Sequence, residues 1–249
     1  MLTIDALRSG DLRETVRLHE DHLDLGLFPK LGPHFLRLYQ EMFARSPYGV
    51  ALVAHEDGGV AGALFGTTAN AAHYDWVIRN HWRTLCFHGA LALATRPGVA
   101  LFFARTRLVR YARGISRRVA AKSPASRQTA PVAVLSHIVT SETYRGRGVA
   151  RRLVDGFRRV ANSHGAHEAS LVTREGGLGQ GFFDHIGCTC VAHRQGADNE
   201  AVCEYHLALD APHLNGWTDA LAAGRPDRSW THDNGERSVG NRQLDPALH

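Results

Sequence analysis

Apolar positions near the start of the chain recur first at strand spacing and then at helical spacing. Residues 2–7 alternate as in a short strand, and Ser9-Gly-Asp11 provides a cap for a helix with apolar residues three or four positions apart. Gly32-Pro33 opens a second helix with a broad apolar face, and Ser46-Pro47 ends it. The pattern therefore predicts a strand followed by two helices.

A β-hairpin is predicted after the second helix. The apolar runs 48–55 and 60–67 flank Glu56-Asp-Gly-Gly59, a composition typical of a tight hairpin turn. The first 68 residues thus have the predicted order strand, helix, helix, strand, strand.

Residues 69–130 combine a helical pattern with strong positive charge. One helix is predicted over about Tyr74–Ala94, a break at Arg96-Pro-Gly98, and a second helix over about Val99–Val119. The segment holds eleven lysines and arginines against one acid, Asp75. Such a basic helical pair suits a membrane surface or an acidic partner such as nucleic acid, but exposed arginines usually only solvate a helix. We expect no nucleic-acid partner.

A strand, a basic glycine turn and a helix follow one another within residues 132–161. Val132–Val139 is a β-branched apolar run, Arg145-Gly-Arg-Gly148 is the turn, and apolar residues then recur at helical spacing. The open N–H groups at a helix N-terminus favour phosphate oxygens, and glycine permits a close approach of the ligand. An ordinary basic turn is the alternative. A Walker loop and a dinucleotide-binding turn fit poorly, since the sequence lacks their further glycine, lysine and acidic positions.

The remainder of the chain predicts the end of a sheet and a polar tail. Gly165 ends the helix, and residues 166–173 form a strand parallel to the one before it. A hairpin is predicted from 189–194 and 200–209, and we expect the polar residues 211–249 to be disordered.

The turn resembles motif A of the Gcn5-related N-acetyltransferase (GNAT) superfamily, because Arg145-Gly-Arg-Gly148-Val-Ala150 meets the pattern Gln/Arg-x-x-Gly-x-Gly/Ala at every defined position. The resemblance implies an α/β (α+β mixed sheet) fold, with a central mixed, mostly antiparallel sheet and flanking helices. It also implies that the turn amides hold the pyrophosphate of acetyl-CoA, while the preceding strand binds the pantetheine arm through its backbone. The implied donor-binding residues are Ile138, Val139, Thr140, Arg145, Gly146, Arg147, Gly148, Val149 and Ala150.

The resemblance covers residues 1–68 by pattern and 131–209 by motif, so we expect one domain over 1–210 with a basic helical insert at 69–130. From its position before the donor-binding strand, the insert is expected to wall or cap the acceptor pocket. The family's motif B is matched only in part by Gly176–Cys188. Phe183 stands where many members have a tyrosine thought to protonate the leaving thiolate, a role that a phenyl ring cannot perform.

Two residues are candidate general bases for attack by an amine. His137 lies on the donor-binding strand and has an unperturbed pKa near the working range of a base, about 6.5. Glu142 follows the end of that strand. The alternatives are a packed or surface histidine and a turn-capping glutamate.

Composition favours an intracellular enzyme without a metal. The chain of 249 residues is 44% hydrophobic and carries no apolar run long enough for a membrane span or the core of a signal peptide, so a cytoplasmic location is expected. Its four cysteines show no disulfide framework. Cys188-Thr-Cys190 lacks a second pair, and we predict two core residues and no metal site.

The predicted function is acetyl-CoA-dependent transfer of an acetyl, or another short acyl group, to a primary amine of a small molecule. Acetylation of a protein or peptide amine and a non-catalytic coenzyme A binding module are the alternatives, because a fold alone does not establish catalysis. The sequence leaves the oligomeric state open, with a homodimer as one expectation.

Overall fold

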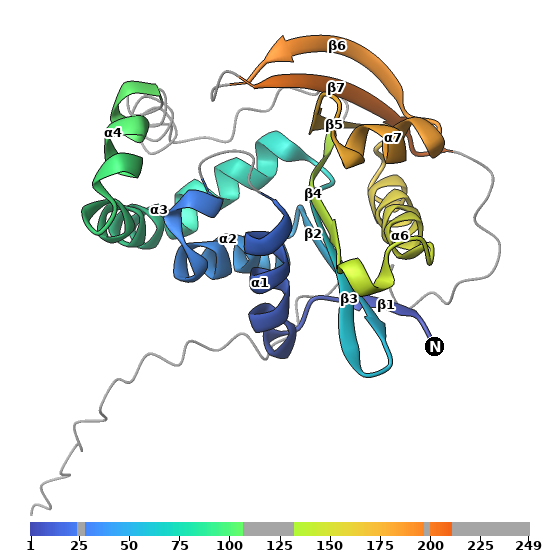
Figure 1. The fold of residues 1–249 in the computed structure, drawn as a ribbon, viewed down its shortest axis with the longest axis horizontal. Helices are drawn as coiled ribbons and strands as arrows, with labels where there is room; N and C mark the ends of the chain where they lie inside the picture. Colours follow the sequence, from blue (N-terminus) through green and yellow to red (C-terminus); the bar gives the residue numbers. More distant parts are fainter. Residues whose placement is uncertain (24–27, 107–131, 197–199, 211–249) are drawn as a thin grey trace, which may run out of the picture.

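A computed structural model describes residues 1–23, 28–106, 132–196 and 200–210 (Figure 1). Short 3-10 helices lie at Ser9–Asp11, Pro29–Leu31 and Glu142–Tyr144. The strands are β1 (Thr3–Ala6), β2 (Gly49–Glu56), β3 (Gly59–Thr67), β4 (Ala133–Thr140), β5 (Glu168–Arg174), β6 (Thr189–Gln195) and β7 (Ala201–Ala208). The helices are α1 (Leu12–His22), α2 (Pro33–Arg45), α3 (Asn70–Ala94), α4 (Pro97–Thr106), α6 (Val149–Ser163) and α7 (Leu178–His185).

The strands form one mixed sheet of order β1-β2-β3-β4-β5-β7-β6. Neighbouring strands are antiparallel except β4 and β5, which are parallel and are joined by α6 as a crossover helix. This arrangement confirms the expected α/β fold with a mixed, mostly antiparallel sheet.

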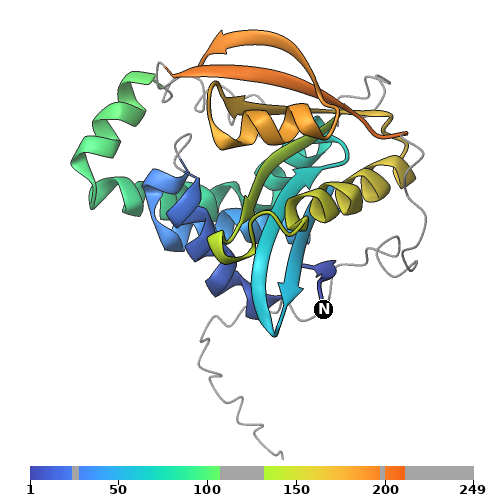
Figure 2. The same cartoon turned by 45° about the vertical axis from the view of Figure 1, so that its right-hand side comes forward.

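Helices cover both faces of the sheet, and each face has its own apolar core. On one face α6 and α7 pack through Leu153, Phe157 and Phe183, and on the other α1 and α2 pack through Leu12 and Phe43. Figure 2 shows α6 and α7 together, with α1 and α2 across the sheet from them. We call the second side the α1/α2 face.

Local turn chemistry explains several element boundaries. Asp57 and Gly58 have φ of 54° and 82°, so the β2–β3 hairpin closes through two left-handed residues, as its sequence predicts. Gly165, with φ of 80°, ends α6 in a Schellman motif, in which Ala166 N–H donates to the carbonyl of Ala161 and Gly165 N–H to that of Asn162. The predicted ends of α2 are also confirmed.

The insert leaves and rejoins the core at one point, because the amide of Asn70 donates a 3.0 Å hydrogen bond to the carbonyl of Val132. Its first helix begins at Asn70, four residues before the predicted Tyr74, directly after β3. The break before Pro97 is confirmed. The second predicted helix lies within the described residues only as far as Thr106, and the tail 211–249 lies outside them.

Within the described residues, no helix is both long and apolar enough to cross a membrane. Figures 1 and 2 show α3 and α4 on the side of α1 and α2, away from α6.

Candidate functional site

The glycine turn before α6 presents open backbone amides. Gly146 and Gly148 have φ of 74° and 79°, a conformation that L side chains rarely adopt, and a Cβ at either position would meet nothing within 4 Å. Within the described chain, the turn's backbone bonds run from Arg145 to the carbonyl of Glu142 and from Arg147 to that of Tyr144. No such bond holds the amides of Gly146 and Gly148, and the first amides of α6 point outward by helix geometry. The turn can therefore donate several N–H groups to one anion.

Charged side chains flank this turn. The Arg145 guanidinium lies 3.1 Å from the Glu142 carboxylate and 3.4 Å from Nδ1 of His22, the last residue of α1. Arg147 stacks over the ring of Tyr144, 5.5 Å from its centroid. The turn is thus basic and tied to α1, which suits a polyanionic ligand.

Strand β4 continues past its parallel partner. Only Ala133, Val134 and Leu135 pair with β5, whereas Ile138, Val139 and Thr140 pair with β3 alone. Since alternate backbone groups of a strand point to its two edges, part of the backbone of 138–140 faces the side that β5 has left. Beyond Leu135 the two strands therefore no longer pair with each other.

A β-bulge in β4 orients His137. Phe65 pairs with His137 and Gly66 with Leu135, so Ser136 is the extra residue. Before the bulge Leu135 packs in the α6 core, and after it Val139 packs in the α1/α2 core. His137 shares a face with Val139, because residues two apart in a strand point the same way.

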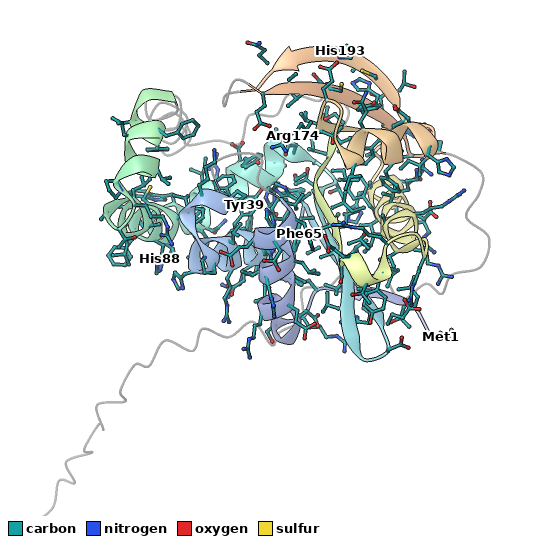
Figure 3. The ribbon with its side chains drawn as sticks, in the orientation of Figure 1. Met1, Tyr39, Phe65, His88, Arg174 and His193 are labelled. Atoms are coloured by element: carbon teal, nitrogen blue, oxygen red, sulfur yellow. The ribbon has the colours of Figure 1, made fainter. Side chains whose placement is uncertain are left out.

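His137 meets two polar rings on the α1/α2 face. Its Nε2 lies 2.9 Å from the hydroxyl of Tyr39, and its ring centroid lies 4.8 Å from that of His19. His19 is fully buried, and neither of its ring nitrogens has a hydrogen-bond partner. Tyr39 and Phe65, both labelled in Figure 3, belong to the same buried apolar cluster. Sequence reasoning missed His19 and Tyr39, because both lie on helix faces that otherwise look like core.

Burial keeps both imidazoles neutral. The pKa of His137 is lowered to about 3, first by loss of solvent contact and then by the nearby His19 ring, although some of its surface remains accessible. Burial lowers the pKa of His19 to about 4. At neutral pH both rings are therefore uncharged, the form of an imidazole that can take up a proton, and the same burial makes each ring a weaker base than a solvated histidine.

The two candidate bases lie in different surroundings. Glu142 is exposed and its carboxylate pairs with Arg145 at the turn, whereas His137 lies under α1 and α2. No hydrogen bond or ion pair joins these two described residues, so the structure does not bring them together as one catalytic unit.

A family model described as the acetyltransferase (GNAT) family matches residues 17–187, well over half of the chain. The chain belongs to this family. It is accordingly a GNAT N-acetyltransferase, an enzyme of the acyltransferase class. No curated protein matches it in sequence.

Solved structures share the GNAT fold at low identity. Ard1 from Thermoplasma volcanium is 12% identical with a TM-score of 0.51, and the match covers 83% of this chain and 97% of that one. The ribosomal-protein-S18-alanine N-acetyltransferase from Escherichia coli is 11% identical with a TM-score of 0.50, over 88% of this chain and 100% of that one. At these identities the likeness concerns the fold.

The GNAT motif B segment of this chain forms α7 and contributes no hydroxyl at Phe183, which is buried. The helix begins at Leu178 although it contains Gly179 and Gly181, which have low helix propensity. A Cβ on Gly179 would lie 2.5 Å from Oγ1 of Thr173, so glycine allows α7 to lie close against β5.

A tyrosine near Phe183 is hydrogen-bonded to a carboxylate. Tyr205 on β7 has its ring centroid 6.1 Å from that of Phe183 and donates a 2.6 Å hydrogen bond to Asp184. This hydrogen bond and burial raise the pKa of Tyr205 to about 12. The raised pKa makes Tyr205 a weaker acid than a solvated tyrosine.

Proposed function

We propose that this GNAT enzyme transfers an acetyl group from acetyl-CoA to a primary amine of a small molecule that approaches from the α1/α2 face. The observation that carries the proposal is the contact of His137 with Tyr39. This contact supports His137 as the proton acceptor, because His137 is uncharged at neutral pH and lies on the strand that continues past β5.

The donor would bind across the turn and the parted strands. The amides of Gly146, Gly148, Val149 and Ala150 are oriented to receive pyrophosphate oxygens, with Arg145 and Arg147 adding positive charge. The backbone of Ile138, Val139 and Thr140 would pair with the pantetheine amides. Both roles follow from family membership and agree with the open groups described above.

The reaction would proceed by direct attack. The amine nitrogen forms a bond to the thioester carbonyl carbon, the carbon–sulfur bond breaks, and the nitrogen gives up one proton. We assign that proton to His137, with Tyr39 orienting the imidazole. With Phe183 in motif B, the leaving thiolate takes its proton from water. Glu142, the other candidate base, is proposed to orient Arg145 toward the donor.

Contacts of the insert support a small acceptor. Side chains of α3 and α4 pack against the α1/α2 core, among them Leu85, Leu93 and Phe102. Lys30, just before α2, lies 4.8 Å above the ring of Phe102. A helical pair placed against the start of α2 restricts the approach to the α1/α2 face, which suits a small amine better than a protein chain.

The test is an acceptor panel. Purified protein is incubated with acetyl-CoA and with amino sugars, amino acids, polyamines and peptides carrying free amines, and thiol release is followed. We expect release with at least one small amine and a loss of about 100-fold or more in kcat for His137→Gln. Turnover with peptides alone would refute the small acceptor, and coenzyme A binding without any turnover would refute catalysis.

A matched control separates His137 from a general effect of histidine loss. His167 is exposed and pairs with Asp210 far from the α1/α2 core, so His167→Gln should keep full turnover. Glu142→Gln is expected to weaken acetyl-CoA affinity and to leave kcat with saturating donor nearly unchanged. A large loss of kcat in Glu142→Gln, with His137→Gln active, would reverse the two assignments.

A further inference from the structure

The β6–β7 hairpin brings together two cysteines and a histidine that no step of the proposed reaction uses. Cys190 Sγ lies 3.6 Å from Nε2 of His193, and Cys203 Sγ lies 3.4 Å from Nδ1 of the same ring. One potential ligand atom from each of the three residues falls within 4.8 Å of the other two. Figure 3 labels His193 on the outer strand of the hairpin.

Strand geometry explains how the cluster forms. His193 on β6 pairs directly with Cys203 on β7. Cys190 is three residues before His193, a spacing that would place the two side chains on opposite faces of a regular strand. Cys190 pairs with Tyr205 and Ala192 with Glu204, so Val191 is an extra residue that resets the alternation. The bulge thereby brings Cys190 to the side of His193.

We propose that Cys190, His193 and Cys203 bind a zinc ion. With Zn–S near 2.3 Å and Zn–N near 2.0–2.1 Å, the ligand atoms of a tetrahedral site lie about 3.5 Å apart. His193 would bind through Nε2, whose 3.6 Å distance from Cys190 Sγ fits this geometry. Cys203 Sγ contacts the other ring nitrogen, Nδ1, and one ligand atom from each of the three residues lies within 4.8 Å of the others. Thiolate sulfur combined with imidazole nitrogen selects zinc over magnesium, calcium or manganese.

A carboxylate adjoins the cluster from the end of β5. Glu175 Oε1 lies 3.4 Å from Nδ1 of His193. A carboxylate beside a ligating imidazole fixes the orientation of the ring and increases its basicity. Glu175 is thus assigned as the positioning residue of the site.

The ligands differ in exposure to solvent, and the exposed side of the site allows an ion to enter from solvent. Cys203, on β7, is fully buried, whereas His193, on the outer strand β6, is exposed. The ion would link β6, β7 and the end of β5 without unfolding of the domain. Cys188, which the sequence pairs with Cys190, packs instead in the α6 core. The metal ligands are therefore contributed across the hairpin and not by neighbouring positions in sequence.

The experiment is a metal titration of the whole reduced chain after treatment with a chelator. Cobalt(II) is added first, and we expect one ion per chain, with a thiolate-to-cobalt charge-transfer band that zinc then abolishes. Cys190→Ser should lose the band and bind zinc at least about 100-fold more weakly, and Glu175→Gln about 10- to 100-fold more weakly. Cys86→Ser, which removes an exposed cysteine on α3, is the control and should bind as the parent does.

Three results would overturn the zinc site. They are a stoichiometry well below one, equal zinc affinity in the parent and Cys190→Ser, and a disulfide between Cys190 and Cys203 in protein purified with reductant. Cys190 is at the surface, so its replacement should leave the circular dichroism spectrum unchanged. Neither the titration nor its variants depend on acetyl transfer.

Discussion

The lowered pKa of His137 predicts how the activity of the enzyme depends on pH. A group with a pKa of about 3 stays neutral across the range in which most enzymes are assayed, so its titration cannot limit activity near pH 6.5. We expect kcat/KM to follow only the protonation of the acceptor amine, with no second step near the ordinary histidine value. Initial rates with two acceptors of different amine pKa would measure this.

The position of the step identifies its source. The pH at which kcat/KM changes should move with the pKa of the acceptor amine. It should be the same in Tyr39→Phe as in the parent. A step fixed near pH 6.5 for both acceptors would show that His137 is solvated and titrates normally in the working enzyme.

Gly148 and Gly165 are matched glycines at the two ends of α6. Both have left-handed φ, and a Cβ at either position would meet nothing within 4 Å, so alanine should cost each protein about 1–2 kcal/mol of stability. Only Gly148 faces the proposed donor. We expect Gly148→Ala to weaken acetyl-CoA binding about tenfold or more and Gly165→Ala to leave it unchanged, as calorimetry can measure. Equal donor affinities would place the pyrophosphate elsewhere.

The glycine turn and the strand before it could be predicted from sequence, whereas the partners of His137 could not. The turn around Gly146 and Gly148 is contiguous, so its glycines and the strand before it carry the signal together. Tyr39 meets His137 across a separation of 98 residues, and only the packing of α2 on the sheet makes them neighbours.

Among the helices, α7 contains two glycines, Gly179 and Gly181, with different surroundings. A Cβ on Gly179 would lie 2.5 Å from Thr173 Oγ1, whereas one on Gly181 would meet open space. Gly179→Ala should therefore destabilise the fold by about 1–3 kcal/mol, and Gly181→Ala should stabilise it by about 0.5–1 kcal/mol. Urea unfolding of both variants measures the difference. A stabilised Gly179→Ala would show that α7 and β5 separate easily.

Element order was predictable because each boundary has a local cause. Asp57-Gly58 and Gly165 adopt the backbone conformations that their residue types favour. The start of α7 was less predictable, since glycine has low helix propensity and only the contact with Thr173 explains its presence. The proposed zinc ligands could not be predicted from the sequence either. The bulge that brings Cys190 to the side of His193 cannot be inferred from the spacing of these two residues.

For the whole molecule, contact between the insert and the start of α2 is expected to govern the acceptor and not the donor. Phe102→Ala removes the ring beneath Lys30 and should raise the acceptor KM about tenfold while acetyl-CoA affinity stays the same. Phe87→Ala, which removes a ring on α3 that is 66% exposed, is the control and should change neither. An unchanged acceptor KM in Phe102→Ala would separate the insert from substrate recognition.

Buried histidines should also make the domain sensitive to acid. The pKa of His73 is lowered by burial to about 4, below its value near 6.5 in the unfolded chain. The unfolded state therefore binds the proton first, and stability is lost as pH falls from about 6.5 to 4, by about 2 kcal/mol at pH 5 for this residue. His19 and His137 act in the same direction.

His73→Phe tests this linkage outside the proposed catalytic residues. The His73 ring stacks on Phe43, which a phenyl ring can also do. The variant should lose less stability than the parent between pH 8 and pH 5, measured by urea unfolding at each pH. The same loss in both proteins would assign the acid sensitivity to other groups.

The short pairing between β4 and β5 leaves unpaired strand edges within the sheet. After three residue pairs the ladder stops, so the protein carries two unfinished strand edges inside a sheet, where exposed edges usually recruit other chains. Here α6 and α7 cover one side and α1 and α2 the other, which keeps a foreign polypeptide out. The proposed donor suits such an edge, because coenzyme A carries two amides in its pantetheine arm. If the donor binds as proposed, its pantetheine arm would complete an interrupted sheet, and the cofactor would serve for one turnover as a removable strand.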